Sequence, residues 1–168
     1  IQQAEQLLPL VGVQIEGMLP SIRPFAEGAA AIGYVDIAPD ADGVYRRVDP
    51  LRRGSDRRIY PHFATAIARL AAGTSQQQIV STVPDGYIDI AGVRCPLDDE
   101  GRMLIDYCGP TGTVTRYAAW EVLEGLVDPS QFRDRIVLVG ATAAGLYDIR
   151  PSPYPSTGRE FFGVETNA

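Results

Sequence analysis

The sequence predicts an α/β fold, a mixed sheet with a central parallel strand, flanking helices and two inserted β-hairpins. The first observation behind this prediction is residues 136–139, a continuous apolar run rich in β-branched side chains, which suits a parallel strand covered on both faces. The second is that segments with helical spacing alternate with strand-like segments. The third is a pair of acidic turns, each set between two strand-like segments. Alternating helices and strands indicate this fold class.

The chain is long enough to bury one hydrophobic core. It has 168 residues, of which 45% are hydrophobic, and a chain of this size buries roughly 70% of its unfolded surface. We therefore expect a single domain over residues 1–168. Because the chain starts without Met and stops inside an unfinished segment, we expect it to be truncated at both ends. No apolar run approaches the length of a membrane span.

Three segments place apolar residues at helical spacing: residues 20–31, 60–73 and 117–126. In the first, Ser21 can cap the helix, Pro24 suits the first turn, and Gly33 is expected to end it. In the second, Pro61 is expected in the first turn and Gly73 at the C-terminal cap.

Two hairpins are expected. The first runs from residues 32–37 through a Pro-Asp-Ala-Asp-Gly turn into residues 44–48. Such turn residues supply a left-handed position and side-chain hydrogen bonds to the backbone. The second runs from residues 87–95, turns at residues 98–101 and returns through residues 102–107.

Both acidic turns have a composition similar to that of calcium-binding loops. Aligning Gly43 with the sixth loop position puts Ala38 first and Asp49 twelfth, where Asp and Glu are required. The match fails at both ends, so we interpret both segments as hairpin turns and expect no metal site.

The charged residues exclude several classes of function. All fifteen basic residues are arginine, against 21 acidic residues, which gives a net charge of −6. The absence of lysine excludes a Walker phosphate loop and Schiff-base mechanisms. The acidity disfavours nucleic acid as a partner, because phosphates need clustered positive charge. With one histidine and no Gly-x-Gly fingerprint, we expect neither a multi-histidine metal site nor a cofactor.

Catalysis has little support in the sequence. His62 is the only imidazole, and beside Pro61 at a helix start a capping or packing role is the commoner one. No serine occupies a Gly-x-Ser-x-Gly elbow. We expect no enzyme in this fragment; a hydrolase-like enzyme that uses His62 or a carboxylate pair is the alternative.

Six arginines between residues 46 and 58 form a basic island with a net charge of +4, because only two aspartates accompany them. Bidentate guanidinium contacts can hold a carboxylate, a phosphate or a lipid headgroup. The alternative, which the pattern favours, is a solvated loop with one structural ion pair. If Val44 and Val48 face the core, strand alternation places Arg46 inward, where it must be paired, and Arg47 in water.

The end of the predicted central strand offers a second ligand position. Residues 139–142 leave this strand where open α/β sheets place ligands, and Thr142 adds a hydroxyl. A structural turn is the favoured alternative. Asp148 follows shortly after and is an expected partner for Arg46 or Arg150. The candidate ligand contacts are therefore Arg46, Arg47, Thr142 and Asp148.

Cys95 and Cys108 flank the second hairpin. In the expected register Cys108 lies four residues beyond the position opposite Cys95, roughly 13 Å away at the usual strand rise. A disulfide needs α-carbons within about 7 Å. A free, buried pair is therefore favoured, and a disulfide in an oxidising compartment is the alternative.

A series of short segments carries a family pattern: residues 33–35, 39–48, 60–61, 63–70, 96–98, 101–107, 109–110, 136–142, 145–148 and 163–165. In this order they resemble the type 2 CHASE domain. The resemblance covers residues 20–168, and residues 1–19 match poorly.

This resemblance implies an extracytoplasmic sensory domain, periplasmic or extracellular, of a bacterial receptor in the inner or cytoplasmic membrane. It implies covalently linked transmembrane helices and a cytoplasmic effector, such as an adenylate or guanylate cyclase, a Ser/Thr or histidine kinase, or a diguanylate cyclase. The partner would be an unknown small ligand or envelope component, and a homodimer is expected because such outputs generally act as dimers. A cell-envelope interaction domain without a small ligand is the alternative.

Overall fold

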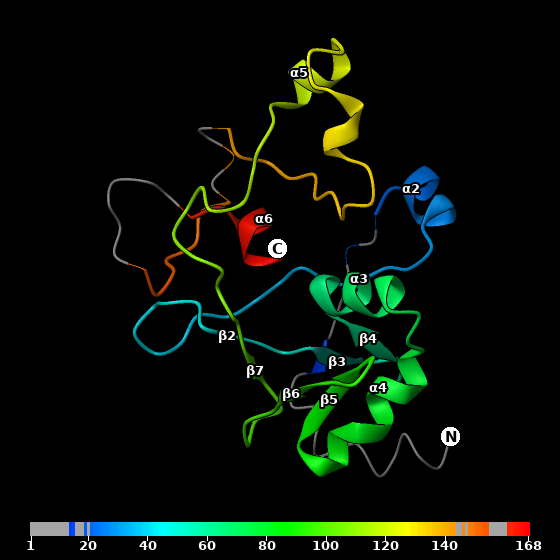
Figure 1. Ribbon diagram of the computed structural model, residues 1–168. Helices are drawn as coiled ribbons and strands as arrows, with labels where there is room; N and C mark the ends of the chain where they lie inside the picture. Colours follow the sequence, from blue (N-terminus) through cyan, green and yellow to red (C-terminus); the bar gives the residue numbers. More distant parts are fainter. Residues whose placement is uncertain (1–13, 16–18, 20, 144–145, 147, 155–160) are drawn as a thin grey trace. The chain divides into compact units, whose positions relative to one another are not determined.

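The computed structural model of the chain describes residues 14–15, 19, 21–143, 146, 148–154 and 161–168 (Figure 1). The chain divides into two compact units, residues 1–105 and residues 106–168, which are termed the first and the second unit. Helices and small sheets both occur in the described residues, so the α/β class is confirmed.

Three short strands of the first unit form one sheet. β1 (Gln14–Ile15) pairs in parallel with β3 (Leu51–Gly54), and β4 (Ile59–Pro61) pairs antiparallel with β3. Residues 55–58 form the turn between β3 and β4. Part of the arginine-rich window, which the sequence favoured as a solvated loop, is therefore a strand.

The second expected hairpin has a different register in the structure. β5 (Tyr87–Ile90) pairs antiparallel with β6 (Val93–Pro96), and the two-residue turn between them is Ala91-Gly92. Both turn residues have positive φ, 52° and 86°, as a type I′ turn requires. The prediction failed because alanine rarely adopts positive φ. Residues 98–101 form a separate turn after β6.

The first expected hairpin is confirmed only in its turn. The N–H of Gly43 donates to the carbonyl of Asp40 at 2.8 Å. Among the described residues, however, the two flanking segments do not pair with each other. β2 (Arg47–Val48) instead pairs antiparallel with β7 (Met103–Leu104).

α2 (Arg23–Gly28) is shorter than expected. Pro24 lies in its first turn as expected, but no side chain caps its start, so the cap expected from Ser21 is not formed. The helix ends well before Gly33. At Gly33 a Cβ atom would lie 2.6 Å from the Cα of Phe63, so this glycine permits two backbone segments to approach closely.

α3 (Phe63–Ala71) begins after Pro61, which belongs to β4 and not to the first helical turn. His62 is its N-cap residue, and the imidazole Nδ1 accepts a hydrogen bond from the N–H of Ala64 at 3.4 Å. At the other end Gly73 has φ 66° and its N–H bonds back to the last turn. The C-terminal cap expected at Gly73 is therefore confirmed.

α4 (Gln76–Thr82) packs beside β5 and continues into the short helix η1 (Val83–Asp85). Ser75 and Gln78 form a capping box at its start. One buried hydrophobic cluster of the first unit comes from β3, α4, η1 and β5 and consists of Leu51, Ile79, Val83 and Ile88. Each such side chain contributes roughly 1.5–3 kcal/mol when fully buried, so this core anchors the strand that carries Arg52.

The second unit contains α5 (Ala119–Leu123), η2 (Pro129–Gln131) and α6 (Gly163–Thr166). α5 is the central part of the expected helix over residues 117–126. Phe161 is buried and packs edge-to-face on Tyr107, with ring centroids 5.1 Å apart.

The expected central parallel strand is not shown. Residues 136–139 belong to no sheet formed by the described residues, and Val139 is 90% exposed. A β-branched apolar run favours an extended backbone, but a central parallel strand also needs a partner strand on each edge. The run by itself does not specify those partners.

Candidate functional site

Two acidic turns of the first unit meet three arginines in a network of ion pairs. This turn network consists of Asp40, Asp42, Arg46, Arg47, Asp98 and Arg102. One oxygen of Asp40, Oδ2, accepts hydrogen bonds from Nη1 of Arg46 (3.4 Å) and from Nη1 of Arg47 (2.7 Å). Arg47 also lies 3.5 Å from Asp98, measured from Nε to Oδ2. Arg47 is therefore the residue that joins the two turns.

Backbone pairing holds this arrangement. Arg47 lies opposite Leu104 where β2 meets β7, and the N–H of Ile105 donates to the carbonyl of Arg46 at 2.9 Å. The turn at residues 98–101 directly precedes β7, so pairing of the two strands brings its carboxylates to the arginines that follow the first turn.

Arg46 is paired as expected, but strand alternation does not separate an inward Arg46 from an Arg47 in water. Their side chains are about equally exposed, 36% for Arg46 and 35% for Arg47, and both are paired. The alternation argument assumed a strand over residues 44–48, whereas β2 begins only at Arg47. Alternation of faces applies only where the backbone is a strand.

For Asp42, Arg46 and Asp98 the pKa is shifted so that the charged form is favoured. The guanidinium of Arg46 lowers the pKa of Asp42, and the hydrogen bond to Asp42 in turn raises the pKa of Arg46. Burial alone would raise the pKa of Asp98. Backbone N–H donors and the charge of Arg102 outweigh it, so the pKa of Asp98 lies below its ordinary value.

A second arginine cluster of the same unit is centred on a buried arginine, although one of its members, Asp36, is 83% exposed. It consists of Tyr34, Asp36, Asp49, Arg52 and His62 and is termed the buried cluster. The Arg52 side chain is 7% exposed. Its Nε and Nη2 donate to Oδ2 of Asp49 at 3.0 and 2.8 Å, and its Nη1 donates to Asp36 at 3.1 Å. Burial alone would lower the pKa of Arg52, but the hydrogen bonds to its carboxylate partners raise it.

Tyr34 lies at the centre of the buried cluster. The guanidinium carbon of Arg52 lies 4.5 Å from its ring centroid, and its hydroxyl donates to the backbone carbonyl of Asp49. Burial raises the pKa of this hydroxyl. His62 meets the same ring edge-on, with centroids 5.2 Å apart. Because His62 is 2% exposed and its Nδ1 caps α3, the structure gives it a capping and packing role.

In the folded structure, carboxylates neutralise much of the positive charge of the basic island. Carboxylates lie within ion-pair distance of four of its six arginines: Arg46, Arg47, Arg52 and Arg58. No ion pair with Arg53 or Arg57 is formed among the described residues. The partners include Asp36, Asp40 and Asp98, which come from outside the window. A ligand at this surface would therefore compete with carboxylates that are already in place.

Sequence reasoning missed Arg52 and Asp49. The available signal was their spacing of three residues across the buried Pro50 and Leu51. That signal was overlooked because the part of the window after the expected strand at residues 44–48 was interpreted as a loop, whereas Arg52 belongs to β3.

The other two candidate ligand residues belong to the second unit. Thr142 is exposed. Asp148 forms an ion pair with Arg150 at 3.4 Å, which was one of its two expected partners. Its backbone carbonyl also accepts from the N–H of Gly163 at 2.9 Å, and a Cβ at Gly163 would meet its carboxylate at 2.3 Å. Asp148 therefore packs directly on the start of α6.

Both cysteines are free thiols in the structure. Cys108 is exposed, so the expectation of a buried pair is wrong. Cys95 is half-buried on β6, and burial raises the pKa of its thiol.

Comparison with known proteins identifies the family. A family model described as the CHASE2 domain matches residues 1–168. The chain belongs to the CHASE2 domain family. The match extends over residues 1–19 as well as the segments whose motifs indicated the family. Searches of curated proteins and of solved structures found no match.

CHASE2 domains are extracytoplasmic sensory parts of transmembrane receptors, and the chain is consistent with a sensory role. Among its described residues, none of the helices has the length and apolar character needed to cross a bilayer. In the CHASE2 chain, the two arginine clusters are thus candidate elements of a sensor.

Proposed function

We propose that this CHASE2 chain is the signal-input domain of a bacterial membrane receptor and controls a cytoplasmic cyclase or kinase. The chain itself would perform no catalysis, and it would act as a homodimer because such outputs generally do. Residues 1–168 would form one sensory domain that includes both units. The observation that carries the proposal is the match of the family over the whole chain.

The ligand would be a carboxylate or phosphate compound that binds Arg46 and Arg47 in exchange for Asp40. Asp40 offers the same oxygen to both guanidinium groups, so neither arginine has a bidentate partner in it. A ligand with two acceptor oxygens would give one or both arginines the bidentate geometry that guanidinium prefers. Arg46 and Arg47 are 36% and 35% exposed, so ligand oxygens can reach both guanidinium groups, although the Asp40 side chain that they would replace is only 13% exposed.

Such an exchange would transmit a signal because Arg47 joins the two turns. Releasing Asp40 leaves Arg47 with the Asp98 turn alone. The bound and free forms would then differ in whether Arg47 pairs with carboxylates of both turns or of one. A ligand shifts an effector only by binding one arrangement better than the other. Thr142, which is exposed, and Asp148, which is paired with Arg150, are separate candidate contacts in the second unit and take no part in this exchange.

The experiment uses the full-length receptor in membranes, with second-messenger production or phosphorylation as the readout. The double variant Arg46→Ala/Arg47→Ala should abolish the response to stimulus while the melting temperature changes by only a few degrees. The matched control is Arg53→Ala, which removes a neighbouring arginine that forms no ion pair among the described residues. An unchanged response in the double variant would eliminate the ligand role of these arginines.

A second candidate function has one observation in its favour. Several apolar side chains near α5 are exposed: Trp120, Leu123 and Leu126. Exposed apolar groups of this kind favour a cell-envelope interaction domain without a small ligand. Thermal-shift titration of the intact protein with inorganic phosphate and with succinate separates the two functions. A shift that Arg46→Ala/Arg47→Ala removes supports the first, and no shift with either probe supports the second.

A further inference from the structure

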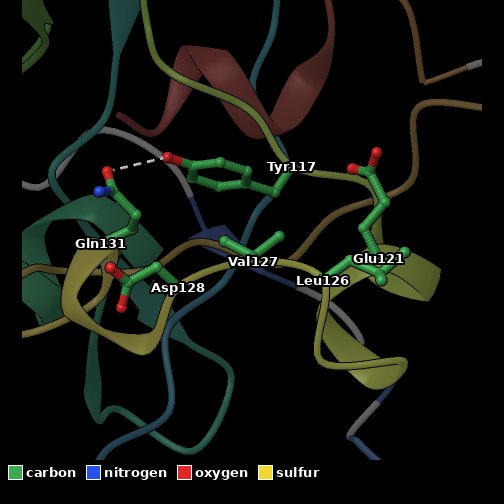
Figure 2. A pocket seen from close by; sticks show the side chains of 6 residues that line it. All are labelled: Tyr117, Glu121, Leu126, Val127, Asp128 and Gln131. Carbon is green, nitrogen blue, oxygen red and sulfur yellow. Dashed lines mark hydrogen bonds between the residues drawn. The ribbon is translucent and has the colours of Figure 1, made fainter.

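The second unit contains a shallow hollow of about 470 Å³ that is open to solvent; Leu126, one of its lining residues, is 67% exposed. It is lined by Tyr117, Glu121, Leu126, Val127, Asp128 and Gln131. Figure 2 shows these side chains around the space between α5 and η2. The hollow lies outside both arginine clusters, and the function proposed above does not use it.

One wall of the hollow is held by side-chain contacts. The hydroxyl of Tyr117 donates to Oε1 of Gln131 at 3.1 Å, which ties the chain before α5 to the end of η2 (Figure 2). The Tyr117 ring also packs edge-to-face on Phe132, with centroids 5.6 Å apart. An aromatic ring face held in this way can attract a cation.

The charged and the apolar side chains of the lining occupy different parts of the hollow. Glu121 and Asp128 lie toward opposite ends of the displayed lining, and Leu126 and Val127 lie between them (Figure 2). No arginine lines the hollow. An anion would be repelled by both carboxylates. A single metal ion would need several converging ligands, and the described residues hold no group of three or more carboxylate, thiol or imidazole side chains suited to one.

Both carboxylates keep acceptor capacity, because an ionised carboxylate has about four lone-pair sites, although Asp128 also has a side-chain hydrogen bond with Ser130. Glu121 uses Oε2 to accept from the N–H of Ala118 at 3.0 Å, and Asp128 uses Oδ1 to accept from the N–H of Ser130 at 2.9 Å. Among the described residues neither forms an ion pair, in contrast to the carboxylates of the turn network. The N–H of Ser130 lowers the pKa of Asp128, so this end of the hollow is charged at neutral pH.

We propose that this hollow binds a linear aliphatic diamine. One ammonium group would pair with Glu121 and the other with Asp128, and the methylene chain would lie over Leu126 and Val127. The ring of Tyr117 would face the chain or one ammonium group. Two cationic ends joined by an apolar chain match two carboxylates separated by an apolar strip, and each ammonium supplies donors for the available oxygens.

Calorimetric titration of the intact protein with 1,4-diaminobutane tests this proposal. We expect saturable binding at one site, and binding of n-butylamine about fivefold weaker, because it lacks the second ammonium and one exposed ion pair is worth up to about 1 kcal/mol. Glu121→Gln and Asp128→Asn should each weaken diamine binding by a similar factor. Both amides can still serve as helix caps, so neither variant should lose the fold.

The matched control is Glu124→Gln, which makes the same charge change on the turn that ends α5 but does not line the hollow. It should leave diamine binding unchanged. Absence of saturable binding overturns the proposal. So does equal weakening by all three variants, which would indicate attraction by net charge alone. The proposed anion site is tested with variants of Arg46 and Arg47, and the diamine site with variants of Glu121 and Asp128. Failure of one proposal therefore leaves the other still testable.

Discussion

The turn network and the buried cluster use the same two groups, guanidinium and carboxylate, but their arginines differ in exposure to solvent. Arg47 is 35% exposed and has carboxylate partners on two turns, whereas Arg52 is 7% exposed and lies between Asp49, Asp36 and the ring of Tyr34. The difference teaches that burial, and not residue type, decides what an arginine does in this domain.

The free-energy cost of breaking an ion pair also depends on how deeply the pair is buried. Removing one member of a buried ion pair leaves a charge without water or partner, which costs roughly 3–5 kcal/mol. Removing one member of an exposed pair costs about 1 kcal/mol or less, because water replaces the partner. The buried cluster is therefore suited to hold the fold, and the turn network is suited to exchange partners.

The largest expected effect is that of Arg52→Ala. It leaves the mostly buried carboxylate of Asp49 without its guanidinium and removes the cation from the ring of Tyr34. We expect the free energy of unfolding, measured by urea denaturation, to fall by about 3–5 kcal/mol. Arg53→Ala, one residue further along β3, is the control and should change it by less than about 1 kcal/mol. Equal loss of stability in Arg52→Ala and Arg53→Ala would contradict the idea that the buried arginine holds the fold.

Tyr34→Phe should have the next largest effect. The substitution keeps the ring against Arg52 and His62 and removes only the hydroxyl that donates to the carbonyl of Asp49. That carbonyl then loses its donor, and we expect stability to fall by about 1–2 kcal/mol in the same denaturation experiment. A variant as stable as the parent would show that this hydrogen bond makes no net contribution.

Arg47→Ala should change stability by about 1 kcal/mol or less, because Arg47 is 35% exposed and Arg46 remains as a partner of Asp40. The double variant with Asp40→Ala completes a mutant cycle, which isolates the coupling energy of the pair. We expect this coupling to shrink at high salt because the pair is partly exposed to solvent. A coupling energy above about 2 kcal/mol that does not change with salt concentration would show that Arg47 behaves like the buried Arg52.

The smallest expected effect concerns pH and Asp98. Its folded-state pKa is lowered, so its ionised form stabilises the fold above the unfolded-state pKa of about 3.9. That contribution is lost as the pH falls through the folded-state pKa. Asp98→Asn should therefore reduce the fall in the free energy of unfolding as the pH is lowered. The control Asp99→Asn should reduce this fall less. Identical profiles for Asp98→Asn and the parent protein would refute this contribution.

Sequence reasoning succeeded where neighbouring residues decide the outcome. The turn ending at Gly43, the cap at Gly73 and the Asp148–Arg150 pair all depend on residues only a few positions apart. It failed for the hairpin turn at Ala91-Gly92, because an alanine with positive φ is tolerated only when the rest of the hairpin compensates for it.

By itself the sequence determined the acidic balance, the arginine island, the fold class and the motifs of the family. Only the tertiary structure decided which arginine is buried, because burial of Arg52 depends on β3 being a strand beside Tyr34 and Asp49. It likewise decided that Arg47 joins two turns more than fifty residues apart in the chain. The physical reason is that charge and turn propensity are local properties, whereas burial and strand pairing arise only when distant segments pack together.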